Sequence, residues 1–207
     1  MEKWVQDKIE RARIERWKRL DLGKAGLTEI PQTVCELEGL ENLLLTEEYY
    51  DSELEKWVVS ENHGRPNLIS VIPEQIALLT GLTSLDLSGT QVEDLSPLHA
   101  LTGLTSLYLS GAQVEDLSPL WALTELIDLD LSGTQVEDLS PLHALTGFTF
   151  LNLSESRLRV FPLWLLHLPH LESLSLYGTP ITNLPLELLG ASSGVNCLAA
   201  VRAHIAD

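Results

Sequence analysis

The side chains best suited to chemistry in this sequence are carboxylates that recur at a fixed spacing. Three QVED segments place adjacent acids 22 residues apart, at Glu93–Asp94, Glu115–Asp116 and Glu137–Asp138. If these segments stack, the acids form a ladder with rungs about 5 Å apart. At that distance exposed like charges repel by about 1 kcal/mol or less in a water-like dielectric. A cation ladder is one interpretation; the one we favour is that each aspartate caps the turn that follows it.

The other motifs exclude most catalytic chemistry. The string DLDLSG from Asp128 begins like a calcium loop, but its twelfth position is Leu139 and its aspartates fall on a predicted strand. No nucleophile and base pair, HExxH, GxSxG or glycine-rich phosphate loop occurs. Cys35 and Cys197 stand far apart, outside any CxxC pair. We therefore predict no catalytic residues, no metal site and no cofactor.

The elements that position these residues are internal repeats. A unit that begins LTSLDLSGTQVEDLSPL at Leu82 recurs from Leu104 and Leu126, and looser copies follow from Phe148 and Leu171. Another copy covers residues 17–39, and the stretch 40–81 is a copy interrupted by an insertion at 48–66. The sequence thus predicts seven repeats over residues 17–189.

Each repeat begins with alternating leucines, which predict a short strand with one apolar face. One repeat cannot bury that face alone, so stacked neighbours must bury it continuously. Ser-Pro pairs, as at Ser96-Pro97, favour one short helical turn on the return path. The helical spacing of Trp4, Val5, Ile9 and Ala12 predicts an N-terminal cap helix within residues 1–16. Residues 190–207 are expected to form a second cap helix or a linker to a downstream domain.

The repeats resemble the leucine-rich repeat family. The signature LxxLxLxx(N/T/C)xL is met by residues of the third repeat at Leu82, Leu85, Leu87, Thr90 and Val92. The resemblance implies an α/β class solenoid, right-handed and curved, with a parallel sheet on its concave face. The 22-residue form is similar to that of internalins, which implies a signal peptide and an immunoglobulin-like domain that these residues do not contain.

In this family the concave face is the usual binding surface, and the repeat spacing predicts which side chains it carries. Seven of them combine aromatic rings with polar groups: Asp86, Tyr108, Asp128, Asp130, Phe150, Asn152 and Tyr177. Aromatic anchors among polar residues are typical of interface hot spots. The three acids favour a partner with a basic surface, whereas the alternative is a solvated sheet face with scattered aromatics.

The insertion at 48–66 is the second candidate contact. Its centre is helix-like and is flanked by a turn that contains glycine, and we expect the insertion to project from the loop after the second strand. Insertions in repeat proteins map to loops and often carry recognition. A contact with a partner or with the chain itself and a passive excursion both remain open.

Composition limits the partners. The 207 residues contain 30 acids and 13 bases, for a net charge of -17, so neither nucleic acid nor an anionic membrane is an expected partner. No stretch approaches 18 uninterrupted apolar residues, and the charged N-terminus does not resemble a signal peptide. Together with two isolated cysteines, this favours a cytoplasmic protein without membrane insertion.

The closing segment LPLELLGASSGVNCLAAVRAHIAD resembles the junction of bacterial Roco proteins, where repeats lead into a Ras-like GTPase domain. This implies a regulatory arm in bacterial signalling whose partner is a protein or the downstream GTPase domain. No GxxxxGK[ST] motif occurs, so nucleotide chemistry would lie beyond Asp207. The alternative hypothesis is the substrate-recognition repeat domain of a bacterial effector.

One position closes each coil, and the family implies that its side chain bonds to the backbone of the turn. It is held by Asn67, Thr90, Ala112, Thr134, Ser156 and Thr179. Hydroxyl and amide groups can form such a bond, but the methyl group of Ala112 cannot. We expect the fourth coil to lack this bond.

Overall fold

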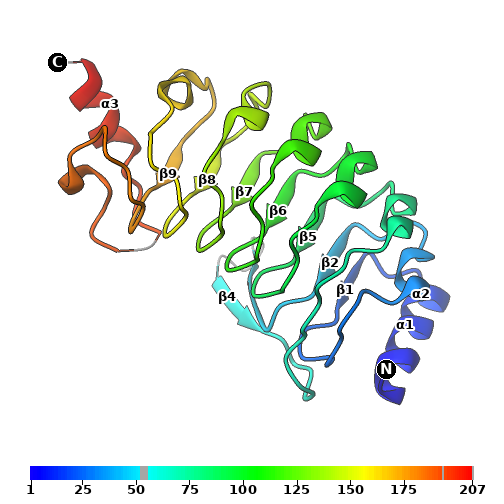
Figure 1. The fold of residues 1–207 in the computed structure, drawn as a ribbon. Coiled ribbons are helices and arrows are strands. Elements are labelled where there is room, and N and C mark those ends of the chain that lie inside the picture. The colour runs from blue at the N-terminus through cyan, green and yellow to red at the C-terminus, as the bar shows by residue number, and fades with distance from the viewer. Residues whose placement is uncertain (52–55, 193, 207) are drawn as a thin grey trace.

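The computed structural model describes residues 1–51, 56–192 and 194–206, and within these ranges it forms a parallel solenoid. Each coil contributes one three-residue strand to a seven-stranded sheet of order β1-β2-β5-β6-β7-β8-β9. The strands are Arg19–Asp21 (β1), Asn42–Leu44 (β2), Ser84–Asp86 (β5), Ser106–Tyr108 (β6), Asp128–Asp130 (β7), Phe150–Asn152 (β8) and Ser173–Ser175 (β9). Figure 1 shows them side by side in a curved stack, as the sequence predicted.

The core is a stack of leucines in constant register. The middle residue of every strand in this sheet is a leucine with no exposed surface: Leu20, Leu43, Leu85, Leu107, Leu129, Leu151 and Leu174. Each pairs with the leucine of the next strand, as Leu107 does with Leu129. Full burial of one such side chain contributes roughly 1.5 to 3 kcal/mol. The alternation read from the sequence is confirmed.

Short helical turns line the side opposite the sheet (Figure 1). They are α2 (Gln32–Cys35) and the 3₁₀ turns η1 (Glu74–Leu78), η2 (Ser96–Ala100), η3 (Ser118–Ala122), η4 (Ser140–Leu142), η5 (Leu163–His167) and η6 (Leu186–Leu188). At the Ser-Pro turns, Oδ1 of Asp94, Asp116 and Asp138 accepts the backbone N–H of the serine two residues later at 2.8 Å. The predicted capping role of these aspartates is confirmed.

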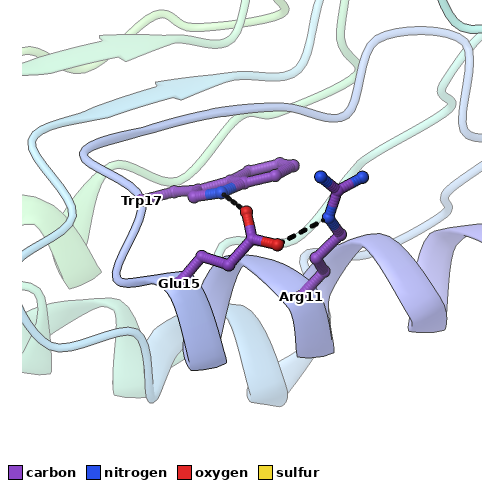
Figure 2. Close-up of polar contacts among 3 residues, drawn as sticks. All are labelled: Arg11, Glu15 and Trp17. Atoms are coloured by element: carbon purple, nitrogen blue, oxygen red, sulfur yellow. Dashed lines mark hydrogen bonds and ion pairs between the residues drawn. The ribbon is translucent and has the colours of Figure 1, made fainter.

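The helix α1 (Lys3–Glu15) covers the first coil and buries Val5, Ile9 and Ala12 against the core. It ends at Arg16 in the left-handed region. Figure 2 shows Glu15 between two partners: one oxygen accepts Nε–H of Arg11 at 2.8 Å, and the other accepts the indole N–H of Trp17 at 2.8 Å. The Arg11 guanidinium also lies 5.5 Å from the centre of the Trp17 ring. These contacts stabilise the exit from the helix into β1.

The last strand is covered by the segment that follows η6. The backbone N–H of Cys197 donates to the carbonyl of Leu174 at 2.7 Å, and Oδ1 of Asn196 accepts the N–H of Leu174 at 3.1 Å. These residues pair with β9 as a further rung would. The helix α3 (Leu198–Ala206) then buries Leu198 and Val201. A paired and covered strand offers no template for edge-to-edge association.

The insertion forms a hairpin, and the expected helix-like centre is wrong for its described part. Strands β3 (Glu48–Asp51) and β4 (Lys56–Val59) pair antiparallel, with Glu48 opposite Val59. Residues 52–55, in the middle of the expected helix, lie outside the described residues. Aromatic and β-branched residues such as Tyr49 and Val58 fit a pleated ribbon better than a helix. In Figure 1, β4 lies beside the strands at the N-terminal end of the solenoid, away from the helical turns.

The coil-closing position follows the sequence expectation only in part. The hydroxyls of Thr90, Thr134 and Thr179 each donate at 2.6 Å to the carbonyl three residues earlier, within their own turn. Asn67 bridges coils instead: its amide donates to the carbonyls of Leu22 and Leu45, both at 2.8 Å, and its oxygen accepts the N–H of Leu27 at 2.9 Å.

Two further coils lack this bond. Ala112 is fully buried in the same turn, and its side chain has no polar atom to donate. The hydroxyl of Ser156 is buried without a hydrogen-bond partner in the described part of the chain.

Replacing Asn67 should destabilise the N-terminal half of the stack. Asn67→Ala leaves three buried backbone groups unpaired, and one such group costs about 1 to 3 kcal/mol. We expect the free energy of unfolding, measured by urea titration, to fall by at least about 2 kcal/mol. Asn67→Asp keeps the acceptor for Leu27 but places a carboxylate against two carbonyls, so it should also destabilise. A loss below about 0.5 kcal/mol for Asn67→Ala would contradict the bridging role.

Replacing Ala112 should have the opposite effect. Ala112→Thr adds a hydroxyl that can reach the carbonyl of Leu109, together with a methyl group that becomes buried. We expect a gain of roughly 0.5 to 1.5 kcal/mol in the free energy of unfolding. Thr134→Ala, the reverse change in the next coil, should lose a similar amount. A destabilising Ala112→Thr would show that the coils are not equivalent at this position.

Candidate functional site

The structure brings the seven predicted residues to one face of the sheet, and we refer to them together as the concave patch. Asp86, Tyr108, Asp130 and Asn152 pair in one row across β5 to β8. Asp128 pairs with Phe150 in the adjacent row. Tyr177 follows β9, and its carbonyl accepts the N–H of Glu155 at 2.6 Å. The repeat spacing alone was sufficient to group them.

Three members of the concave patch also end their strands. The side-chain oxygens of Asp86, Asp130 and Asn152 accept the backbone N–H of the residue two positions later, at 2.9, 2.8 and 3.1 Å. Such bonds turn the chain out of the strand. The repeat pattern predicted these side chains as surface contacts and did not indicate their second role. The signal that could have revealed it is the serine that follows each of them after one residue.

Two of the seven are buried, which the alternation of the strands did not predict. Asp86 is 4% exposed and Asn152 is 7% exposed, because each side chain folds back onto its own turn. Burial raises the pKa of Asp86 to about 6. The other five residues are half-buried and present part of their surface.

The half-buried carboxylates of the concave patch have neutral partners. Asp128 accepts the hydroxyls of Ser106 at 3.3 Å and Thr149 at 3.2 Å. Asp130 accepts the hydroxyl of Ser132 at 2.6 Å and the amide of Asn152 at 3.1 Å. Within the described ranges, the ion pairs between side chains all lie in the first two coils and the cap helix. Among the described residues, the carboxylates of Asp128 and Asp130 therefore form no ion pair.

Tyr108 lies close to these acids. Burial and the nearby charge of Asp128 raise the pKa of its phenol to about 12, with smaller contributions from Asp86 and Asp130. The phenol is therefore neutral at physiological pH. It presents an aromatic ring and a hydroxyl group beside two carboxylates.

The N-terminal end of the same face is occupied by the insertion, and this is the intramolecular contact that the sequence left open as one alternative. The hydroxyl of Ser60 donates to the Asp21 carboxylate at 2.9 Å, and the amide of Asn62 donates to the carbonyl of Gly23 at 2.8 Å. Gly23 has no room for a side chain, because a Cβ there would collide with the carbonyl of Thr46. The segment that follows β4 is thus bonded to Asp21 at the end of β1, so this part of the insertion is not a passive excursion.

Two further contacts tie the insertion to the rest of the chain. The ammonium of Lys8 on α1 donates to Oδ1 of Asn62 at 2.8 Å. Partial burial lowers the pKa of Lys8, against the opposing effects of Asp21 and Glu61. On β1, the Arg19 guanidinium lies 4.6 Å from the centre of the Tyr49 ring. The insertion therefore makes intramolecular contacts with both the cap helix and the sheet.

In the part of the chain that the structure describes, no three His, Cys, Asp or Glu side chains gather as a metal site would require. Across the same residues, no helix has the length and apolar character needed to cross a bilayer.

Comparison with known families agrees with the coil geometry. Residues 80–122, which contain β5 and β6, match the family described as Leucine Rich repeats (2 copies). Residues 80–122 therefore match leucine-rich repeats, and the coils on either side continue the same fold. A comparison of the sequence with curated proteins gave no match.

Solved leucine-rich repeat structures share this fold. An internalin of Listeria monocytogenes is 23% identical with a TM-score of 0.68, and the match covers 89% of this chain and 52% of that one. Internalin C2 of the same species is 29% identical with a TM-score of 0.57, and the match covers 84% and 77%. A leucine-rich repeat protein of Leptospira interrogans is 25% identical with a TM-score of 0.63, and the match covers 84% and 46%. The chain thus spans about half the length of two of these three neighbours.

The buried charge of Asp86 predicts a pH-dependent stability. Its pKa is about 6 in the folded chain and about 3.9 in an unfolded one. The folded state therefore binds the proton more tightly, and the free energy of unfolding falls as the pH rises from about 4 through about 6.

Replacing Asp86 tests this dependence. Asp86→Asn keeps the oxygen that caps Ser88, as Asn152 caps Ser154, and removes the charge. We expect a gain of roughly 1 to 3 kcal/mol at pH 7 that disappears near pH 4, measured by urea titration at both values. Asp130→Asn is the matched control, because Asp130 accepts the equivalent bond two coils later but is only half-buried. This variant should change the free energy of unfolding little. An equal gain at both pH values would exclude the charge as its cause.

Proposed function

We propose that this leucine-rich repeat domain is a protein-binding module and that the concave patch makes the contact. The observation that carries the proposal is the arrangement of Tyr108, Phe150 and Tyr177 among carboxylates on one sheet face. Partly exposed aromatics surrounded by polar groups are enriched at interface hot spots. In this proposal Asp86 and Asn152 support the strand ends, and the five half-buried members contact the partner.

The expected partner is a protein with a basic surface. No lysine or arginine occurs in residues 66–156, which span the four strands that carry most of the concave patch. Complementary charge raises association rates and selects among partners more than it adds affinity. The same charge disfavours nucleic acid and anionic lipid.

We further propose that the domain is the regulatory arm of a bacterial cytoplasmic Roco GTPase. The support is the resemblance of the closing segment, where η6 leads through a short linker into α3. The competing proposal is a bacterial effector that uses its repeats to select a substrate. The DNA sequence downstream of Asp207 distinguishes them: a phosphate-binding loop before a Ras-like domain favours the first, and a different catalytic domain favours the second.

Removing the aromatic anchors should weaken partner binding without unfolding the domain. Proteins captured by the isolated domain are identified by mass spectrometry, and the affinity of a confirmed partner is measured by calorimetry. Tyr108→Ala combined with Phe150→Ala should cost about 2 kcal/mol of binding free energy. The melting temperature should change little, because both rings are partly exposed.

A control variant on another surface completes this experiment. Trp121 is 67% exposed on η3, away from the sheet, so Trp121→Ala should leave the affinity unchanged. If Tyr108→Ala with Phe150→Ala leaves the affinity unchanged, the concave patch is not the contact, and the insertion becomes the next candidate.

A further inference from the structure

At its N-terminal end, the concave face already contains an arginine paired with an aromatic ring beside an aspartate. The guanidinium of Arg19 lies 4.6 Å from the centre of the Tyr49 ring, and Asp21 follows two residues later on the same strand. The Asp21 carboxylate also attracts the ammonium of Lys8, an interaction that favours the charged form of the lysine. The chain therefore supplies its own cations at this end of the face.

The same residue types recur on β6 to β8, where the chain supplies no cation. Tyr108 pairs with Asp130, and Phe150 pairs with Asp128. Neighbouring strands lie about 4.8 Å apart, and residues i and i+2 of a strand about 6.5 Å apart. Each carboxylate on β7 thus has an aromatic residue directly opposite it on one neighbouring strand, Tyr108 on β6 for Asp130 and Phe150 on β8 for Asp128.

We propose that Tyr108, Asp128, Asp130 and Phe150 form a subsite for an arginine side chain of the partner. A guanidinium is planar, carries five N–H donors and stacks on aromatic faces, so it can contact both carboxylates and a ring together. A lysine ammonium is a compact, strongly hydrated point charge that lacks this planar fork. The assignment rests on the proposed function and specifies the chemistry of the group that is recognised.

Two buried hydroxyls lie beside Asn152, at the end of the concave patch beyond the subsite. Ser154 and Ser175 have no exposed surface, and neither hydroxyl has a hydrogen-bond partner in the described residues. Ser175 pairs with Asn152 on the patch, and Ser154 follows Asn152 by two residues. Buried polar groups are paired in most proteins. Both hydroxyls are closed to solvent, so the acceptors that a guanidinium can reach in the subsite are the half-buried carboxylates of Asp128 and Asp130.

The side chain that is recognised can be identified with peptides. A phage library of random heptapeptides is selected on the whole 207-residue chain, and the most enriched peptide is synthesised. Its principal basic residue is then exchanged among arginine, lysine and the neutral isostere citrulline. Fluorescence anisotropy should give binding at least tenfold weaker with citrulline and at least threefold weaker with lysine. Lysine in place of arginine among the enriched peptides would overturn the proposal.

Variants of the chain locate the subsite. Asp128→Asn with Asp130→Asn should weaken the arginine peptide at least tenfold, while the amide oxygen introduced by Asp130→Asn keeps the turn bond as Asn152 does in the next coil. The matched control, Glu93→Gln with Glu115→Gln, removes the same charge from exposed residues of the loops. Exposed charges are largely screened beyond about 8 Å at 0.15 M salt, so the control should change binding less than twofold. Equal losses in the two variants would overturn the subsite.

The failure of this inference is distinct from failure of the proposed function. A partner that needs Tyr108 and Phe150 but binds equally well after its arginines become lysines would overturn the arginine subsite alone. A partner unaffected by Tyr108→Ala with Phe150→Ala would overturn both.

Discussion

The structure depends on one constraint, which is that a single coil cannot bury its own leucines. A three-residue strand with one inward side chain gains stability only when the next coil covers that side chain, so every coil must keep the register of its neighbour. Leu85, Leu107 and Leu129 meet this condition with no exposed surface. The interruption at 48–66 is tolerated because it lies in the loop after β2 and leaves the pairing of β2 with β1 and β5 intact.

The same constraint shapes the concave face before any partner does. A strand of three residues must end in a turn, and Asp or Asn at its last position accepts the N–H that this turn leaves unpaired. Part of the acidity of the face is therefore a consequence of folding, as the bond from Ser132 to Asp130 shows. Asp128 differs, because it stands at the first position of its strand and has only two hydroxyl contacts at 3.2 and 3.3 Å. The fold does not require a charge there, which favours a role in recognition.

The periodic features could be predicted from the sequence and the others could not. The strands, the buried leucines and the caps before the Ser-Pro turns follow from residue types repeated at a constant interval. The extent to which a side chain on one face is buried does not follow from this repetition. The alternation assigned Asp86 to the outer face of the sheet but could not indicate that it is only 4% exposed. The bonds from Ser60 and Asn62 to Asp21 join residues 39 and 41 positions apart across an interrupted repeat. No pattern in the chain encodes that contact.

The insertion also determines which part of the concave face remains available. Ser60 and Asn62, which follow β4, donate to Asp21 and Gly23, and the Arg19 guanidinium lies over the Tyr49 ring of the hairpin. At that end the Asp21 carboxylate accepts hydrogen bonds from Ser60 and Asn62 and interacts with the charge of Lys8. On β7 the corresponding carboxylates have only hydroxyl and amide partners. A basic partner gains most electrostatic energy where the chain has compensated least, so the hairpin at the first coils shifts the expected contact toward β6 to β9.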